Sequence, residues 1–223
     1  MKTAALALLL AVGLVLAAQS GTIAEDQEPH HRVRLENRYI RVVEFEIPAG
    51  SSTQFFSRSR ETVGVTVSRT TLRSRDLGRI AVEQRPSPAG DLFGGDFTRQ
   101  SQQLRLWNVG EQPYRAILLE LLRPLPAPIP EPNGPGDPDF ETPHFAAYRY
   151  VLPEGVSSPT HSHTRPYLIV AATPMKLRMT APNGQSRFED LLPGDFHWVD
   201  AKLTHAFYNE GEQQGQIVEI ELK

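Results

Sequence analysis

Three histidines in the C-terminal half have the type and spacing to do chemistry. His161 and His163 are separated by one residue, so on a β-strand both side chains point to the same face. His205 follows the turn 193–195 and precedes Asn209 by four residues. Imidazole is the commonest neutral metal ligand, and three protein ligands leave positions for solvent or substrate. We therefore predict that these histidines bind one divalent transition metal ion in the interior of a barrel.

Other polar side chains are weaker candidates. Tyr167 could donate a hydrogen bond or a proton beside such a metal, although a packed tyrosine with a satisfied hydroxyl is more common. His197 lies between two aromatic residues and is expected to face outward. His30 and His31 lie in a polar stretch, where we expect them to be solvated or disordered. The three candidate ligands could also bind a ligand by hydrogen bonds in a barrel without metal.

The elements that must position these residues are short β-strands. Val63, Val65 and Val67 alternate with polar or small residues, and the run 39–47 ends at Pro48-Ala49-Gly50. Gly, Pro, Asn and Asp bound the other short runs in the same way. No segment longer than about ten residues has a 3.6-residue period. The pattern predicts an all-β sandwich or small barrel.

The two halves of the chain match each other in sequence. Residues 107–112 (WNVGEQ) match 208–213 (YNEGEQ), and residues 47–50 (IPAG) match 152–155 (LPEG). Both matches occur in the same order at nearly the same separation, which indicates a duplicated unit. In this frame three residues of the first copy stand opposite the candidate ligands, namely Phe56, Arg58 and Leu104. The first copy should therefore bind no metal. Arg58 could point inward and hold a carboxylate, or could face solvent, which is more common for arginine.

The sequence divides into four predicted segments. Residues 1–20 have a basic residue, an apolar run and small residues, the order of a cleaved signal peptide, with an uncleaved anchor as the alternative. Residues 32–123 form the first barrel and 144–223 the second. Between them, 124–143 is rich in proline, which favours an extended linker.

Composition restricts the location and the partners. The sequence has no cysteine, which excludes disulfides and a lipoprotein anchor and favours secretion into a bacterial periplasm. Removal of residues 1–20 takes away Lys2 and no acidic residue, so the formal charge changes from −3 to −4. Without a basic block, nucleic acid and, after signal cleavage, membranes are poor partners.

The histidine pattern resembles the two motifs of the cupin superfamily. The matching segments are Gly155-x5-His161-x-His163, Pro193-Gly194-Asp195 and His205-x3-Asn209. Because the first half fits the same frame, the chain resembles a secreted two-cupin (bicupin) protein. This resemblance implies two tandem double-stranded β-helix (jelly-roll) barrels and an interior iron, manganese, zinc or nickel ion.

The chain departs from the family pattern at two places. Cupins usually have a glutamate ligand three or four residues after the second histidine, where this chain has Tyr167 and Leu168. Residues 200–202, Asp-Ala-Lys, replace the usual Pro-x-Gly, and we do not interpret them as an acid and a base. The resemblance thus implies a three-histidine site, similar to that of thiol-dioxygenase-type cupins.

Three classes of function remain open. The first is a metal-dependent enzyme acting on a small molecule, with a dioxygenase ahead of an isomerase or a hydrolase. The second is a non-enzymatic binding protein of the periplasm or envelope that uses the barrel as a ligand pocket. A purely structural module is the third. A homodimer is compatible with each class.

Overall fold

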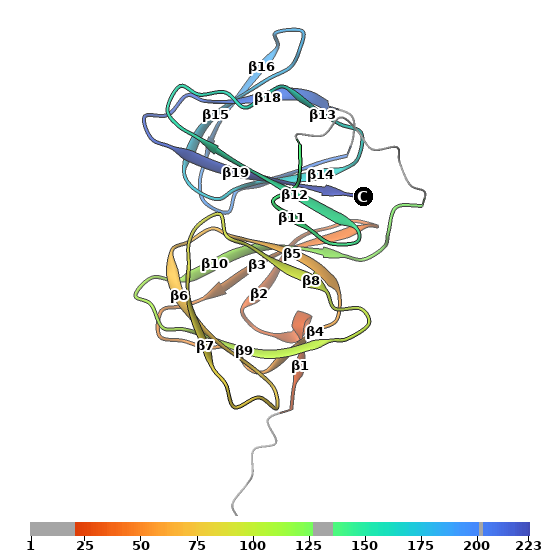
Figure 1. The fold of residues 1–223 in the computed structure, drawn as a ribbon, viewed down its shortest axis with the longest axis vertical. Coiled ribbons are helices and arrows are strands. Elements are labelled where there is room, and N and C mark those ends of the chain that lie inside the picture. Colours follow the sequence, from red (N-terminus) through yellow and green to blue (C-terminus); the bar gives the residue numbers. More distant parts are fainter. Residues whose placement is uncertain (1–20, 127–135, 201–202) are drawn as a thin grey trace, which may run out of the picture.

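The chain folds into two stacked β barrels, which lie one above the other in Figure 1. This computed structural model describes residues 21–126, 136–200 and 203–223. In these ranges the helical structure is the three-residue 3-10 turn η1 (Glu25–Gln27). None of the described helical structure is long and apolar enough to cross a membrane. The predicted all-β class with tandem barrels is confirmed, whereas the predicted signal peptide lies outside the described residues.

Strands β1 to β10 build the first barrel from two five-stranded sheets. The strand orders are β1-β4-β9-β6-β7 and β2-β3-β10-β5-β8. The bounds are β1 Ile23–Ala24, β2 His31–Glu36, β3 Ile40–Ile47, β4 Phe56–Arg58, β5 Glu61–Thr66, β6 Thr70–Asp76, β7 Glu83–Ser87, β8 Leu92–Asp96, β9 Gln102–Asn108 and β10 Tyr114–Leu121.

Strands β11 to β19 build the second barrel. A five-stranded sheet, β11-β12-β19-β14-β17, faces a four-stranded sheet, β13-β18-β15-β16. The bounds are β11 Phe140–Glu141, β12 Phe145–Leu152, β13 His161–His163, β14 Tyr167–Ala171, β15 Met175–Thr180, β16 Ser186–Leu191, β17 Phe196–Val199, β18 Leu203–Asn209 and β19 Gly215–Leu222.

The duplicated Asn-x-Gly-Glu-Gln segment makes the same turn in both barrels. In the second barrel Asn209 Nδ2 donates to the carbonyl oxygens of Leu152 (2.9 Å) and Gln213 (2.7 Å), and the Gly211 N–H donates to Asn209 Oδ1 (2.9 Å). The corresponding bonds of the first barrel join Asn108 to Ile47, Gln112 and Gly110. The asparagine side chain thus bonds the end of one strand to the turn that precedes another strand. These bonds fix the alignment of the two strands in each barrel.

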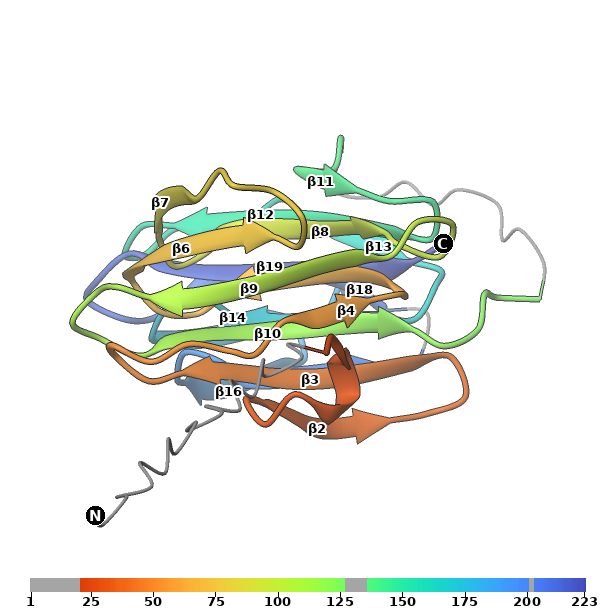
Figure 2. The same cartoon turned by 90° about the horizontal axis from the view of Figure 1, so that it is seen from below.

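One apolar core joins the two barrels. In Figure 1, β3, β5 and β10 of the lower barrel face β12, β14 and β19 of the upper one, and Figure 2 shows the strands from below. Because side chains alternate along a strand, one face of each of these strands enters this shared core and the other lines its own barrel. The buried residues of the shared core are Ile40, Val42, Val63, Val65, Val67, Ile117, Leu119, Phe145, Ala147, Leu168, Val170, Ala172, Val218, Ile220 and Leu222.

The segments that flank the predicted first barrel also have structure. Strand β1 pairs in parallel with β4, so the first barrel includes residues before position 32. The predicted linker 124–143 ends in β11, which pairs with β12, and its residues 127–135 lie outside the described part. His144, the residue after this segment, contacts the first barrel, with its Nδ1 2.7 Å from Glu61 Oε2.

The prediction that His30 and His31 are solvated or disordered is wrong. The imidazole of His31 stacks on Phe45 with ring centroids 4.2 Å apart, and its side chain is 3% exposed. His30 Nδ1 lies 2.9 Å from Glu28 Oε1. Burial opposes ionisation of Glu28, but the close contact of His31 and the hydrogen bonds of His30 outweigh it and lower the pKa of Glu28 to about 2. Residues after η1 therefore form part of the interior of the first barrel.

Arg58 also points into the first barrel. Its Nε donates to Glu25 Oε1 at 3.0 Å, and both residues are buried. Of the two alternatives for Arg58, the inward one is correct, and the carboxylate that it holds belongs to the chain itself. The apolar part of the same interior consists of Val43, Phe45, Ile47, Phe56, Leu72, Leu104, Leu106, Tyr114, Ala116 and Leu118.

The shared core should stabilise both barrels together. Leu119 is fully buried in it, so Leu119→Ala should lower the free energy of unfolding by about 2–5 kcal/mol through the cavity it leaves. Chemical denaturation measures this difference. The matched control is Leu192→Ala, since Leu192 is 65% exposed and should change stability by no more than about 0.5 kcal/mol. Equal effects of the two substitutions would contradict the role of the shared core.

Glu120 should make the stability depend on pH. Burial and the nearby carboxylate of Glu25 raise its pKa to about 7, despite Arg41 and Arg60, whose nitrogens lie 3.6 Å from Glu120 Oε2. Because this folded-state pKa exceeds the ordinary value of 4.5, the folded protein binds a proton that the unfolded chain releases. The contribution is therefore fully present below pH 4.5 and lost as the pH rises through 7.

Glu120→Gln removes this titration. Relative to the parent, the variant should become more stable between pH 5 and 8, by at most about 3 kcal/mol. Thermal unfolding across that pH range measures the difference. A difference between variant and parent that stays constant over the range would show that Glu120 does not carry the proton.

Candidate metal centre

Three strands bring three imidazoles and one carboxylate together inside the second barrel. Strand β13 pairs with β18 so that His161 lies directly opposite His205. His163 shares the face of His161, and Glu219 approaches from β19. One ligand atom of each residue lies within 4.8 Å of those of the other three. Within the described ranges, this is the one group of histidine and acidic side chains that could hold a metal ion.

All three imidazoles direct Nε2 toward the carboxylate of Glu219. The distances are 2.9 Å from His161 to Oε2, 3.2 Å from His163 to Oε1 and 3.0 Å from His205 to Oε1. The contact of His163 lacks hydrogen-bond geometry, and its buried Nε2 has no hydrogen-bond partner. Three ring nitrogens thus converge on one carboxylate.

The second ring nitrogen of each histidine, Nδ1, contacts a group that does not belong to the four cluster residues. The Nδ1 contacts are the Pro159 carbonyl oxygen for His161 (3.0 Å), the Glu221 carboxylate for His163 (2.5 Å) and the Tyr167 hydroxyl for His205 (3.5 Å). Because each ring is fixed at Nδ1, its orientation toward the centre is fixed as well.

Aromatic side chains enclose the cluster. Tyr167 stacks on His163 with centroids 3.9 Å apart, and Tyr150 stacks on His161 at 5.3 Å. The Tyr150 hydroxyl lies 3.2 Å from His161 Nε2. Burial, together with the charge of Glu219, raises the pKa of both tyrosines. Both hydroxyls therefore remain protonated at neutral pH and can donate hydrogen bonds.

The electrostatics of the cluster depend on its two buried glutamates. Burial alone would raise the pKa of Glu219, but hydrogen bonds with His161 and His205 and the close contact of His163 hold it well below 4.5. Burial opposes protonation of His163, whereas Glu219 and Glu221 raise its pKa to about 9. Burial lowers the pKa of His205. In this state Glu219 is an anion surrounded by imidazoles.

The sequence analysis does not identify the carboxylate that lies beside the three predicted histidines. Tyr167 and Leu168 do replace the usual cupin glutamate, but β19 supplies Glu219 from a different strand. The sequence contains the signal for this, because Glu219 and Glu221 alternate with apolar residues in β19. Two acidic residues with period two in a mostly apolar strand must face the same side, and here that side is the barrel interior.

Of the weaker candidates, Tyr167 lies beside the histidines, whereas His197 does not. The side chain of His197 is 39% exposed and pairs with Glu189 at 2.5 Å, so it is not part of the cluster. Asp200 Oδ1 accepts a hydrogen bond from Trp198 Nε1 at 2.7 Å, and Lys202 lies outside the described residues.

The first barrel has the same frame with different contents. Phe56 pairs with Leu104 as His161 pairs with His205. Tyr114 opposes Ile47 as Gly215 opposes Leu152, and this register places Leu118 where β19 has Glu219. The positions of His161, His205 and Glu219 are thus apolar in the first barrel, whereas Arg58, at the position of His163, forms a buried ion pair with Glu25.

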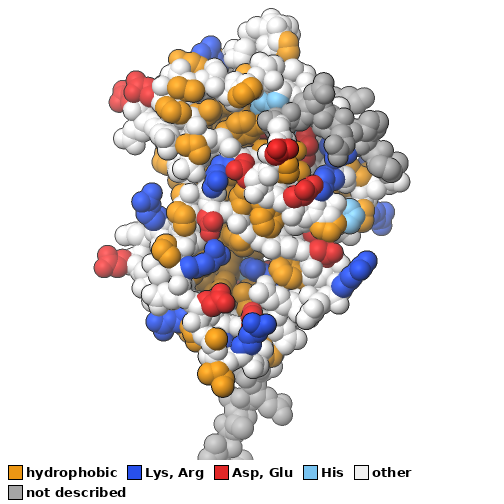
Figure 3. Space-filling view, in the orientation of Figure 1, with side chains coloured by type: hydrophobic (Ala, Val, Ile, Leu, Met, Phe, Trp, Pro, Cys, Tyr) orange, Lys and Arg blue, Asp and Glu red, His pale blue; other side chains and the backbone are white. Residues whose placement is uncertain are grey.

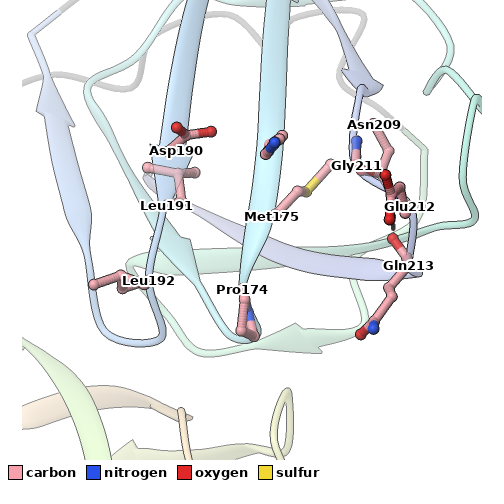
Figure 4. A pocket seen from close by; sticks show the side chains of 10 residues that line it. Pro174, Met175, Asp190, Leu191, Leu192, Asn209, Gly211, Glu212 and Gln213 are labelled. Carbon is pink, nitrogen blue, oxygen red and sulfur yellow. Dashed lines mark hydrogen bonds between the residues drawn. The ribbon is translucent and has the colours of Figure 1, made fainter.

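Four surface hollows are lined by described residues other than the four cluster residues. One, with a volume of about 390 Å³, lies at the ends of β15 and β16 and the turn before β19 (Figure 4); its lining includes Met175, Asp190 and Gln213. On the face shown in Figure 3, basic, acidic and apolar side chains are interspersed. All four cluster residues are buried, with exposed fractions of 4% or less.

Comparisons with known proteins concern the fold. No family model and no curated protein matches the sequence. AerE from Microcystis aeruginosa is 14% identical, with 88% of this chain and 98% of that chain covered and a TM-score of 0.56. A cupin 2 conserved barrel domain protein from Leptotrichia buccalis is 8% identical, with 86% and 88% covered and a TM-score of 0.52. Oxalate decarboxylase from Bacillus subtilis, which has Mn(II) centres, is 12% identical, with 86% and 74% covered and a TM-score of 0.51. Together with the strand order, these similarities show that the chain has the cupin fold, in two tandem barrels.

Proposed function

We propose that the second barrel binds one divalent transition metal ion through His161, His163, His205 and Glu219. The observation that carries this proposal is the convergence of three Nε2 atoms on one buried carboxylate, with every Nδ1 occupied from outside. Metal-binding histidines are oriented in this way, with the second ring nitrogen bonded to an acceptor or water. Iron, manganese, zinc and nickel all accept imidazole and carboxylate ligands.

The donors fit such an ion in kind and in spacing. Ligand bonds of about 2.0–2.2 Å place donor atoms roughly 3–4 Å apart, and the four donors lie within 4.8 Å of one another. His163 Nε2, which is buried without a hydrogen-bond partner, faces the same centre. Four protein ligands would leave two positions of an octahedral ion for other molecules.

A divalent ion also fits the charge of the cluster. Glu219 and Glu221 are 0% and 1% exposed, and a buried charge is costly unless it is paired. A metal ion binds imidazoles in their neutral form, so a divalent ion would displace the proton that the raised pKa of His163 retains and would offset the charge of the two carboxylates.

For the reaction, we propose oxidation of a small molecule by dioxygen. A bound redox-active ion would supply Lewis-acid and electron-transfer chemistry. The chain itself supplies Tyr150, whose protonated hydroxyl lies 3.2 Å from His161 Nε2, as a hydrogen-bond donor at the cluster. One protein of this fold is an oxalate decarboxylase with Mn(II) centres, which supports metal-dependent catalysis.

The second candidate is a non-enzymatic metal- or ligand-binding protein. It is favoured by the burial of the cluster, since His161, the most exposed of the four residues, is only 4% exposed. Oxygen uptake by the metal-loaded protein with thiols, flavonoids and diketones separates the two candidates. Uptake with one substrate class, absent in His205→Ala, supports the enzyme, and a lack of uptake with tight metal binding supports the binding protein.

We also propose that the chain is exported to the bacterial periplasm or secreted. This proposal rests on the apolar run of residues 4–18 and on the lack of cysteine in the sequence. The protein isolated from the periplasm or medium should begin shortly after Ala17 or Ser20. A full-length chain that starts at Met1 and stays in the cytoplasm would contradict export.

If the proposed metal site exists, the protein should bind metal in a defined ratio. The tag-free protein, loaded with Fe(II), Mn(II), Zn(II) or Ni(II), should retain about one equivalent by elemental analysis. His205→Ala and Glu219→Ala each remove a ligand, so the affinity should fall at least about tenfold.

The matched control is His197→Ala, because this histidine lies at the surface and pairs with Glu189. Its metal content should equal that of the parent. Retention of less than about a tenth of an equivalent of every metal by the parent would overturn the proposal. Unchanged content in His205→Ala and Glu219→Ala would show that the ligands lie elsewhere.

A further inference from the structure

Glu221 contacts His163 from outside the proposed metal site. It lies on the same face of β19 as Glu219, is 1% exposed, and its Oε1 is 2.5 Å from His163 Nδ1. In the sheet Glu221 stands opposite Tyr167, whose ring stacks on His163 with an interplanar angle of 19°. His163 is therefore held by a carboxylate at its edge and by an aromatic ring at its face.

The other two imidazoles are held by neutral groups. His161 Nδ1 contacts the carbonyl oxygen of Pro159, and His205 Nδ1 lies 3.5 Å from the hydroxyl of Tyr167. A hydrogen bond to a carboxylate is shorter and roughly twice as strong as a bond between neutral groups. An ionised carboxylate can only accept, so Glu221 keeps a proton on Nδ1 of His163 and leaves the lone pair of Nε2 directed at the centre.

The first barrel has a carboxylate at the same strand position but uses it differently. Glu120 corresponds to Glu221 in the register of the two barrels, and it contacts Arg41 and Arg60. Arg58, which stands in place of His163, bonds to Glu25 instead. A glutamate at this position is therefore compatible with the frame of either barrel, and in the second barrel it orients a histidine.

We propose that Glu221 is a positioning residue. By accepting the Nδ1–H of His163 it fixes the orientation of that imidazole, and through it the affinity and the geometry of the metal site. This inference rests on the proposed function, and it concerns a residue outside the four ligands.

Co(II) is a suitable probe, because its visible spectrum reports ligand geometry. Glu221→Gln keeps the size of the side chain and removes its charge. The variant should still bind one Co(II) ion, with an affinity about 10–100-fold lower and a changed visible spectrum. Glu221→Asp, which keeps the charge, should lose less affinity than Glu221→Ala. The matched control is Glu120→Gln, which should bind Co(II) with the affinity and spectrum of the parent.

A second readout does not depend on the variants. In the Zn(II)-loaded parent, the Nδ1 proton of His163 should give a downfield NMR signal that exchanges slowly with water. Parent-like affinity and spectrum in Glu221→Gln would overturn this inference and leave the metal site intact. If that variant does not fold, a rapidly exchanging Nδ1 proton in the parent overturns the inference. A parent that binds no Co(II) overturns both this inference and the proposed function.

Discussion

Strand β19 serves two cores at once, because successive side chains of a strand point to opposite faces. One face gives Val218, Ile220 and Leu222 to the apolar core that joins the barrels, and the other gives Glu219 and Glu221 to the interior of the second barrel. A slip of one residue would place both carboxylates in the shared apolar core. The pairing of β19 with β12 over eight residues prevents such a slip. The junction of the barrels and the histidine cluster therefore depend on the same register.

The duplicated turn explains how this register is preserved while the interior changes. Asn209 bonds backbone groups at the end of β12 and before β19, and Asn108 makes the corresponding bonds in the first barrel. These bonds involve the backbone of their partners, so they do not depend on the side chains inside the barrel. The interior of the first barrel could thus become apolar around Phe56 and Leu104 without a change of frame.

The sequence predicts those features that depend on local periodicity or on a known motif. His161 and His163 share a face because they are two apart, and His205 is a candidate because it follows the turn 193–195, a pattern that also resembles a cupin motif. Glu219 was missed because a carboxylate was expected only after the second histidine, although its alternation with apolar residues in β19 carried a local signal. The pair Arg58–Glu25 has no such signal, because the two residues are 33 positions apart and meet only through tertiary folding.

Comparison with the first barrel shows which cluster residues of the second barrel are not required for folding. At the positions of His161, His205 and Glu219 it has Phe56, Leu104 and Leu118, and the strands close around them in the same register. Replacing buried ion pairs by well-packed apolar residues is often neutral or stabilising. Closure of the barrel therefore does not require three imidazoles around a carboxylate. Barrel closure alone does not explain a buried polar cluster of this kind, whereas the proposed metal ion at its centre would.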